Sequence, residues 1–103
     1  MVDTTPLTRA VDHFADRLRA APQSRLQRGA AAEALSLARE LARRAQALEE
    51  PGAEPRVMPD AGMFAAADQI TVAVHDLALV LGDEGQVDEA VRLVGEAQSR
   101  AGV

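Results

Sequence analysis

Apolar residues recur along this chain at gaps of three and four residues, in four blocks separated by prolines, glycines and acidic residues. This spacing follows the α-helical period of about 3.6 residues, so each block places its apolar side chains on one face of a helix. The four series are Leu7, Val11, Phe14 and Leu18; Leu26, Ala30, Leu37, Leu41 and Leu48; Met63, Ala67, Ile70, Val74, Leu77 and Leu81; and Val87, Ala90, Val91, Val94 and Ala97. The pattern predicts an all-α protein with four amphipathic helices.

Capping residues and helix breakers predict where these helices begin and end. Pro22 stops the first helix, and Ser24 with Gln27 has the form of a capping box that starts the second. Asp60 is placed to cap the third helix, which Gly82 is expected to end. We therefore expect a single all-α domain over residues 1–103, with helices at about 6–21, 25–49, 61–81 and 86–101.

The connector between the second and third helices has the composition of a loop. Residues 51–59 hold three of the five prolines of the chain together with Gly52, which predicts an extended, exposed and mobile segment. The second helix, at about 25 residues, is longer than its neighbours. Four helices joined mostly by short links predict an up-and-down four-helix bundle or two stacked helical hairpins, with a long second helix.

The charges of the chain argue against nucleic acid as a partner. All eleven basic residues are arginine, and they stand against sixteen acidic residues, which gives a net charge of −5. Neutralising phosphates supplies most of the affinity of nonspecific nucleic-acid binding, and an acidic protein gains little of it. Residues 1–50 carry net +1 (eight arginines, seven acids) and residues 51–103 carry net −6 (three arginines, nine acids). This asymmetry favours packing of a basic helix against an acidic one, within a chain or between two copies.

Three observations favour a cytoplasmic protein that does not cross a membrane. The first six residues carry neither a basic patch nor an apolar run, so they are not expected to form a signal peptide. No stretch approaches the roughly 20 uninterrupted apolar residues of a membrane-spanning helix, since the longest, residues 70–81, contains His75 and Asp76. The chain has no cysteine, which removes disulfides and thiolate chemistry.

Residues 77–90 resemble one tetratricopeptide repeat. Small residues stand at Ala78, Gly85 and Ala90, at offsets where that family places its small packing residues. The resemblance implies that the third and fourth helices pair tightly as an antiparallel hairpin. The family's aromatic positions hold aliphatic residues here, and residues 1–50 contain no second copy. A generic tight helical hairpin over the same residues is the alternative interpretation.

The residues around His75 resemble the phosphoacceptor site of histidine phosphotransfer domains, which are also four-helix bundles. His75 and Leu77 match the histidine of that family and the leucine two residues after it. The resemblance implies that His75 accepts a phosphoryl group. The family's next two residues, a lysine that stabilises the phosphate charge and a glycine that gives access, are replaced by Ala78 and Leu79.

The third helix carries a second apolar stripe opposite its main apolar face. Val72 and Leu79 lie in this stripe with Asp68 and His75, at spacings of four, three and four residues. In the second helix, alanines and Leu35 widen the apolar arc to about half the circumference, as in helices that have more than one partner. The alternative is that Val72 and Leu79 are isolated surface residues.

A homodimer accounts for both of these extra apolar surfaces. A chain of 103 residues has few further residues that could cover two additional helix faces. A second copy of the chain could cover both. We therefore expect a dimer through the second and third helices, with His75 half-buried and bonded to Asp68 or to the second chain. The expected interface residues are Leu35, Asp68, Val72, His75 and Leu79.

No catalytic motif overlies these helices. The chain lacks a glycine-rich phosphate loop, a nucleophile elbow, a tyrosine and the Glu-x-x-His element of di-iron bundles. We therefore expect neither a catalytic site nor a bound cofactor or metal. The favoured function is a small non-catalytic protein-interaction or regulatory module.

Two other functions stay open at this point. One is a ligand-binding or catalytic bundle whose polar site contains His75, Asp68 and arginines of the second helix, namely Arg39, Arg43 and Arg44. The other is a helix-turn-helix regulator, which uses the basic residues around the first turn. Those residues are Arg17, Arg19, Arg25 and Arg28.

Overall fold

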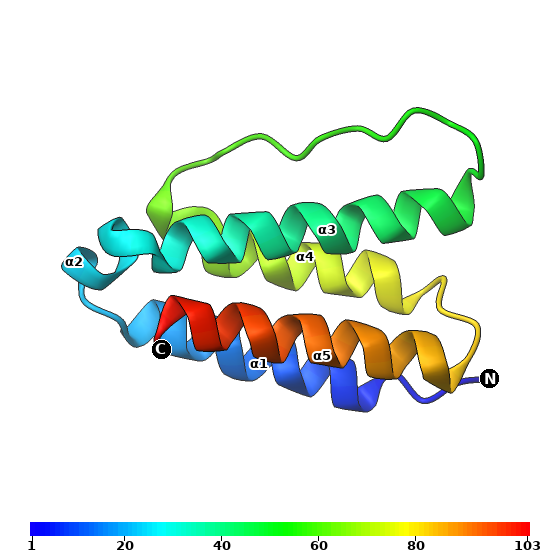
Figure 1. The fold of residues 1–103 in the computed structure, drawn as a ribbon, viewed down its shortest axis with the longest axis horizontal. Helices are drawn as coiled ribbons and strands as arrows, with labels where there is room; N and C mark the ends of the chain where they lie inside the picture. The colour runs from blue at the N-terminus through cyan, green and yellow to red at the C-terminus, as the bar shows by residue number, and fades with distance from the viewer.

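The computed structural model describes residues 1–103, and the predicted all-α class is confirmed because no residue lies in a β-strand. Figure 1 follows the chain from the blue N-terminus to the red C-terminus. The elements are α1 (Thr5–Ala20), a short α2 (Gln23–Arg25) that continues through a π-helical turn (Leu26–Ala30), α3 (Ala31–Glu49), a 3₁₀ turn (Met63–Ala65), α4 (Ala66–Ala78) and α5 (Glu84–Ala101). None of these helices is both long enough and apolar enough to span a membrane.

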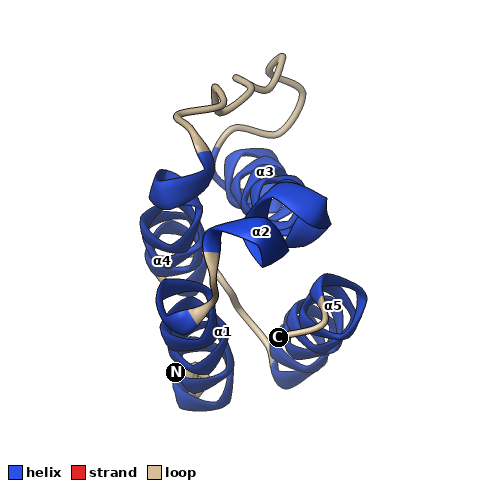
Figure 2. Ribbon diagram, turned by 90° about the vertical axis from the view of Figure 1, so that its left-hand side faces the viewer, coloured by secondary structure: helices blue, strands red, loops and turns tan.

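The four long helices form a bundle of two layers. In Figure 2, α4 and α1 lie side by side in one layer, and α3 and α5 form the other. α4 packs on α3 and α1, and α5 packs on the same two helices, so α4 and α5 occupy diagonally opposite corners. Of the two predicted architectures, the structure has the four-helix bundle.

The connections differ from those of an up-and-down bundle. Residues 50–62 leave the end of α3 and run back along it, so α3 and α4 start at the same end of the molecule and run parallel (Figure 1). α1 and α5 run in the opposite direction. The hairpin expected over residues 77–90, and with it the likeness to a tetratricopeptide repeat, is therefore wrong. The apolar face of α4 is already covered by α3 and α1, which leaves α5 to pack between α1 and α3.

The core is apolar throughout. All 23 buried residues are hydrophobic, and eleven of them are alanine, which allows neighbouring helix axes to approach closely. The first predicted apolar series, from Leu7 to Leu18, is completely buried. At the ends of their predicted series, Leu48 is exposed and Leu81 is only partly buried. The periodic positions therefore predict the core well, except at the helix ends.

Gly29 divides the predicted second helix. Its φ of +143° is not helical, and the chain kinks there between α2 and α3. An L side chain is strained at such a φ, which is why glycine suits this position. The predicted capping box of Ser24 and Gln27 is wrong, because the helix already begins at Gln23 and no side chain caps it.

The boundaries around α4 and α5 also differ from the predicted ones. Asp60 accepts a hydrogen bond from the backbone N–H of Gly62 at 2.8 Å, so it closes a turn ahead of the helix and does not cap it. α4 ends at Ala78, three residues before its predicted end. The side chain of Asp83 caps α5 by accepting from the N–H of Gln86 at 2.8 Å, so this helix begins two residues earlier than expected.

The connector over residues 50–62 is exposed, as predicted, but side chains hold its backbone. Gln46 of α3 bonds both the N–H and the C=O of Arg56, at 2.7 and 3.0 Å. Arg39 of α3 donates to the carbonyl oxygen of Met58 at 2.8 Å. Gln69 of α4 donates to the carbonyl oxygen of Pro59 at 2.9 Å. These bonds keep the connector alongside α3 and α4. Its mobility stays a prediction.

Candidate interaction surface

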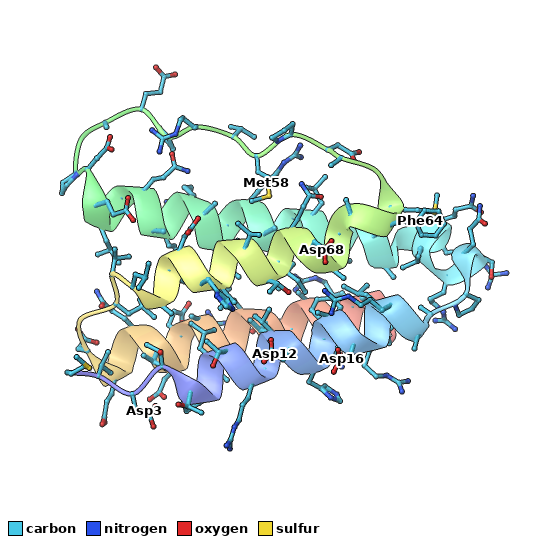
Figure 3. The ribbon with its side chains drawn as sticks, turned by 180° about the vertical axis from the view of Figure 1, so that it is seen from behind. Asp3, Asp12, Asp16, Met58, Phe64 and Asp68 are labelled. Carbon is cyan, nitrogen blue, oxygen red and sulfur yellow. The ribbon has the colours of Figure 1, made fainter.

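The side of α4 that faces away from the core carries a row of exposed side chains. We call this row the α4 stripe. It consists of Phe64 in the 3₁₀ turn before α4, Asp68, Val72 and His75 on α4, and Leu79 directly after its end, at spacings of four, four, three and four residues. Its three apolar members are 73 % (Phe64), 57 % (Val72) and 85 % (Leu79) exposed. Figure 3 looks onto this side of the molecule, where Phe64 and Asp68 are labelled. Apolar side chains of this size gain from burial only when a partner covers them.

Phe64 is the member of the stripe that sequence analysis missed. It lies four residues before Asp68, so the helical spacing that linked Val72 and Leu79 to that aspartate extends to it as well. The signal was therefore present in the sequence. With Phe64 included, the stripe has an apolar residue at each end and one near the middle.

Asp68 is paired with α1 and not with His75. One of its carboxylate oxygens lies 2.8 Å from a guanidinium nitrogen of Arg19, whose other terminal nitrogen is 3.6 Å from Asp16. The predicted bond from Asp68 to His75 is wrong, because seven residues span about 10.5 Å along a helix, which is beyond hydrogen-bond reach. In the single chain, the two polar members of the stripe are therefore independent.

His75 is exposed, and its ring takes part in none of the side-chain hydrogen bonds or ion pairs of the chain. The half-buried position expected for it is therefore not found in the single chain. An accessible imidazole is what the resemblance to histidine phosphotransfer domains requires. However, the positions of that family's lysine and glycine hold Ala78 and Leu79, which offer neither a positive charge nor a side-chain donor to a phosphoryl group.

Leu35 does not join the α4 stripe. It is partly buried and lines a cavity of about 440 Å³ between the starts of α3 and α4, together with Met63, Ala66 and Gln69. The wide apolar arc of α3 is used within the chain, because α3 packs on both α4 and α5. The predicted interface thus divides into four residues of the α4 stripe and one separate residue on α3.

Two arginines of α3 belong to an ion-pair network with α5. Glu40 is 2.6 Å from Arg43 and 2.7 Å from Arg44, and Arg44 also lies 3.7 Å from Glu89 of α5, which pairs in turn with Arg92. The hydrogen bond from Arg43 is the main cause that lowers the pKa of Glu40 to about 2. These arginines therefore do not converge on the α4 stripe, and one chain does not assemble the polar site of the ligand-binding alternative.

The arginines expected of a helix-turn-helix regulator lie around the junction of α1 and α2. Arg19 forms an ion pair with Asp68, and Arg25 donates a hydrogen bond to the carbonyl oxygen of Gly102 at 3.4 Å. Arg17 and Arg28 are exposed. α1 lies diagonally across the bundle from α3 and packs on α4 and α5, so the two helices joined by the turn do not form the packed pair of that motif.

A second cavity, of about 430 Å³, opens where the end of α3 meets the start of α5. Its apolar wall includes Leu48, Leu77 and Leu81, and its rim includes Arg44 and Glu89. The volume is in the range of small-molecule sites. These two rim charges lie 3.7 Å apart and offset each other.

Further observations bear on other kinds of site. No group of three or more His, Asp or Glu side chains is arranged to hold a metal ion, and no buried polar side-chain atom lacks a hydrogen bond. Comparison of the chain with models of protein families, with curated proteins and with solved structures finds no match. The exposed α4 stripe is therefore the feature of the chain that indicates a function.

Proposed function

We propose that this protein is a non-catalytic interaction module that works as a homodimer, with the α4 stripe at the centre of its interface. The observation that carries the proposal is the exposure of Phe64, Val72 and Leu79 along one line of α4. Exposed apolar side chains that are grouped together and flanked by charged residues mark interaction sites. α3 contributes less than its apolar arc predicted, since α4 and α5 cover that arc within the chain.

Covering the stripe supplies the free energy of association. Full burial of one leucine, valine or phenylalanine side chain contributes about 1.5 to 3 kcal/mol, and a two-fold interface buries each of the three twice. Part of this gain is offset by the freedom of motion that two chains lose on association. We therefore expect a dimer that is populated at roughly tens of micromolar.

The proposed partner is a second copy of the chain or another protein, and not a nucleic acid. A net charge of −5 opposes the approach of a phosphate backbone, and the stripe itself contains an aspartate. We also propose a cytoplasmic location, because a chain without cysteine suits a reducing compartment.

Leu79→Glu tests the proposal, with Val57→Glu as the matched control. Val57 is 73 % exposed on the connector, outside the stripe, so both variants place a carboxylate at an exposed apolar position. Light scattering at tens of micromolar is expected to show dimers for the unmodified chain and for Val57→Glu, and monomers for Leu79→Glu. Circular dichroism checks that each variant is folded. A monomeric unmodified chain at this concentration contradicts the proposed function.

A further inference from the structure

We infer that the two copies meet with their α4 helices antiparallel and with Val72 at the two-fold axis. The inference rests on the proposed dimer and adds the geometry and the polar contacts of its interface. The α4 stripe has Val72 near its middle, Phe64 and Leu79 at its ends, and Asp68 and His75 in between.

The spacing of the stripe is self-complementary when one copy is reversed. With a rise of about 1.5 Å per residue in α4 and about 2 Å in the 3₁₀ turn, Phe64 lies about 13 Å before Val72, and Leu79 lies about 10.5 Å after it. In the same way, Asp68 lies about 6 Å before Val72, and His75 about 4.5 Å after it. Reversal about Val72 therefore brings Asp68 level with His75 of the second copy to within about 1.5 Å. It brings Phe64 level with Leu79 of the second copy to within about 2.5 Å.

A parallel arrangement lacks this complementarity. It places every residue of the stripe opposite the same residue of the second copy, so two Asp68 carboxylates face each other. Like charges that meet across an interface cost several kcal/mol. In the antiparallel arrangement each carboxylate faces an imidazole, which donates a hydrogen bond to it in either protonation state, and each apolar end faces an apolar end.

The ion pair between Arg19 and Asp68 extends this complementarity into α1. α1 lies beside α4 on the side of the molecule seen in Figure 3, where Asp12 is labelled. A two-fold axis that reverses α4 also places the two α1 helices on the same side of the α4 pair. Asp12 is about 10.5 Å from Arg19 along α1, the distance that separates His75 from Asp68 along α4. Asp12 of one copy therefore comes level with Arg19 of the other, and each half of the interface gains a second pair of opposite charges.

Single cysteines measure this geometry, because the chain has none of its own. Val72→Cys is expected to form a disulfide-linked dimer under mild oxidation, since its two thiols meet at the axis. Leu79→Cys alone is expected not to link, because its thiols lie about 21 Å apart. An equimolar mixture of Phe64→Cys and Leu79→Cys chains is expected to give the mixed dimer, identified by its mass. Val57→Cys on the exposed connector measures the background of random collisions.

The outcomes of these experiments distinguish a failure of the antiparallel geometry from a failure of the proposed dimer. If Leu79→Cys links to itself above background, the interface is parallel and the inference is overturned, while the proposed dimer stands. If light scattering shows a dimer but no stripe cysteine links, the interface lies elsewhere. The geometry is then overturned together with the place of the α4 stripe in the proposed function, while the dimer itself stands. A monomeric unmodified chain is a failure of the proposed function.

Substitutions at His75 test the polar contact independently. His75→Glu places a carboxylate opposite Asp68 of the second copy, and we expect the dissociation constant of the dimer to rise roughly tenfold or more relative to His75→Gln. Both variants alter an exposed residue, so the fold of the single chain is expected to be unaffected. Equal dissociation constants for the two variants would overturn the contact between Asp68 and His75.

Discussion

Arg19, one residue before the end of α1, and Asp68, the third residue of α4, form an ion pair of 2.8 Å although they are 49 positions apart in the chain. Both side chains are at least half exposed, so the pair contributes little to the stability of the fold. The pair marks the register at which the antiparallel helices α1 and α4 pack, which their buried apolar side chains determine. It gives Asp68 an intramolecular partner, whereas His75, about 10.5 Å further along α4, has none.

His75→Ala is expected to leave the unfolding free energy of the single chain unchanged to within about 0.5 kcal/mol, because the ring is exposed and makes no hydrogen bond. Dimerisation is expected to weaken by roughly fivefold, which corresponds to about 1 kcal/mol for one hydrogen bond. Thermal unfolding at low concentration and light scattering at tens of micromolar measure the two effects. An assay with a small phosphodonor completes the test: phosphate taken up by the unmodified chain and lost in His75→Ala would favour a phosphoacceptor instead.

Gly29→Ala and Gly95→Ala are expected to change stability in opposite directions. A Cβ added at either glycine meets no atom within 4 Å, so steric clashes do not account for a difference between the two variants. Gly29 has a φ of +143°, which strains alanine, and we expect a loss of about 1 to 2 kcal/mol. Gly95 lies inside α5, where alanine is favoured by about 0.5 to 1 kcal/mol. Urea denaturation measures both, and equal effects would show that the kink does not need glycine.

Limited trypsin digestion is expected to cut after Arg56 before any helical arginine, because exposed loops are the usual sites of nicking. Gln46→Ala removes both hydrogen bonds to the backbone of Arg56 and is expected to speed this cut. Gln98→Ala, which alters a side-chain amide near the C-terminus, is the control. Mass spectrometry of early fragments locates the cut. Early cleavage at Arg39 or Arg43 with Arg56 protected would show that the connector is firmly packed.

Acid is expected to remove the contribution of Glu40 to stability. The pKa of Glu40 is about 2 in the folded chain against an ordinary value of 4.5, so the charged carboxylate favours folding above about pH 4.5, and this contribution disappears as the pH falls toward 2. Its size at neutral pH is about 1 kcal/mol, because the side chain is partly exposed to solvent. Urea titrations of Glu40→Gln and the unmodified chain should therefore differ at pH 7 and converge near pH 2. Glu54→Gln, on the exposed connector, should show no such difference.

Helices and their buried faces were predictable from the sequence because the apolar period is a property of each helix alone. Phe14 stands in step with Val11 and Leu18 and is fully buried. Phe64 stands in step with the polar Asp68 and is 73 % exposed. The two phenylalanines of the chain therefore have opposite environments, and the residues at helical spacing from each one are sufficient to distinguish the buried phenylalanine from the exposed one. Four of the five expected interface residues share one exposed row for the same reason.

The tertiary structure alone decided which helices became neighbours. An amphipathic pattern indicates that a face will be covered, but it does not indicate by which helix, because that choice depends on how all four apolar faces pack at once. α4 and α5 are consecutive in the chain and lie diagonally across the bundle, while the long connector lets α4 run parallel to α3. Asp68 consequently meets Arg19 from a distant part of the sequence, and Leu35 lines a cavity away from the α4 stripe.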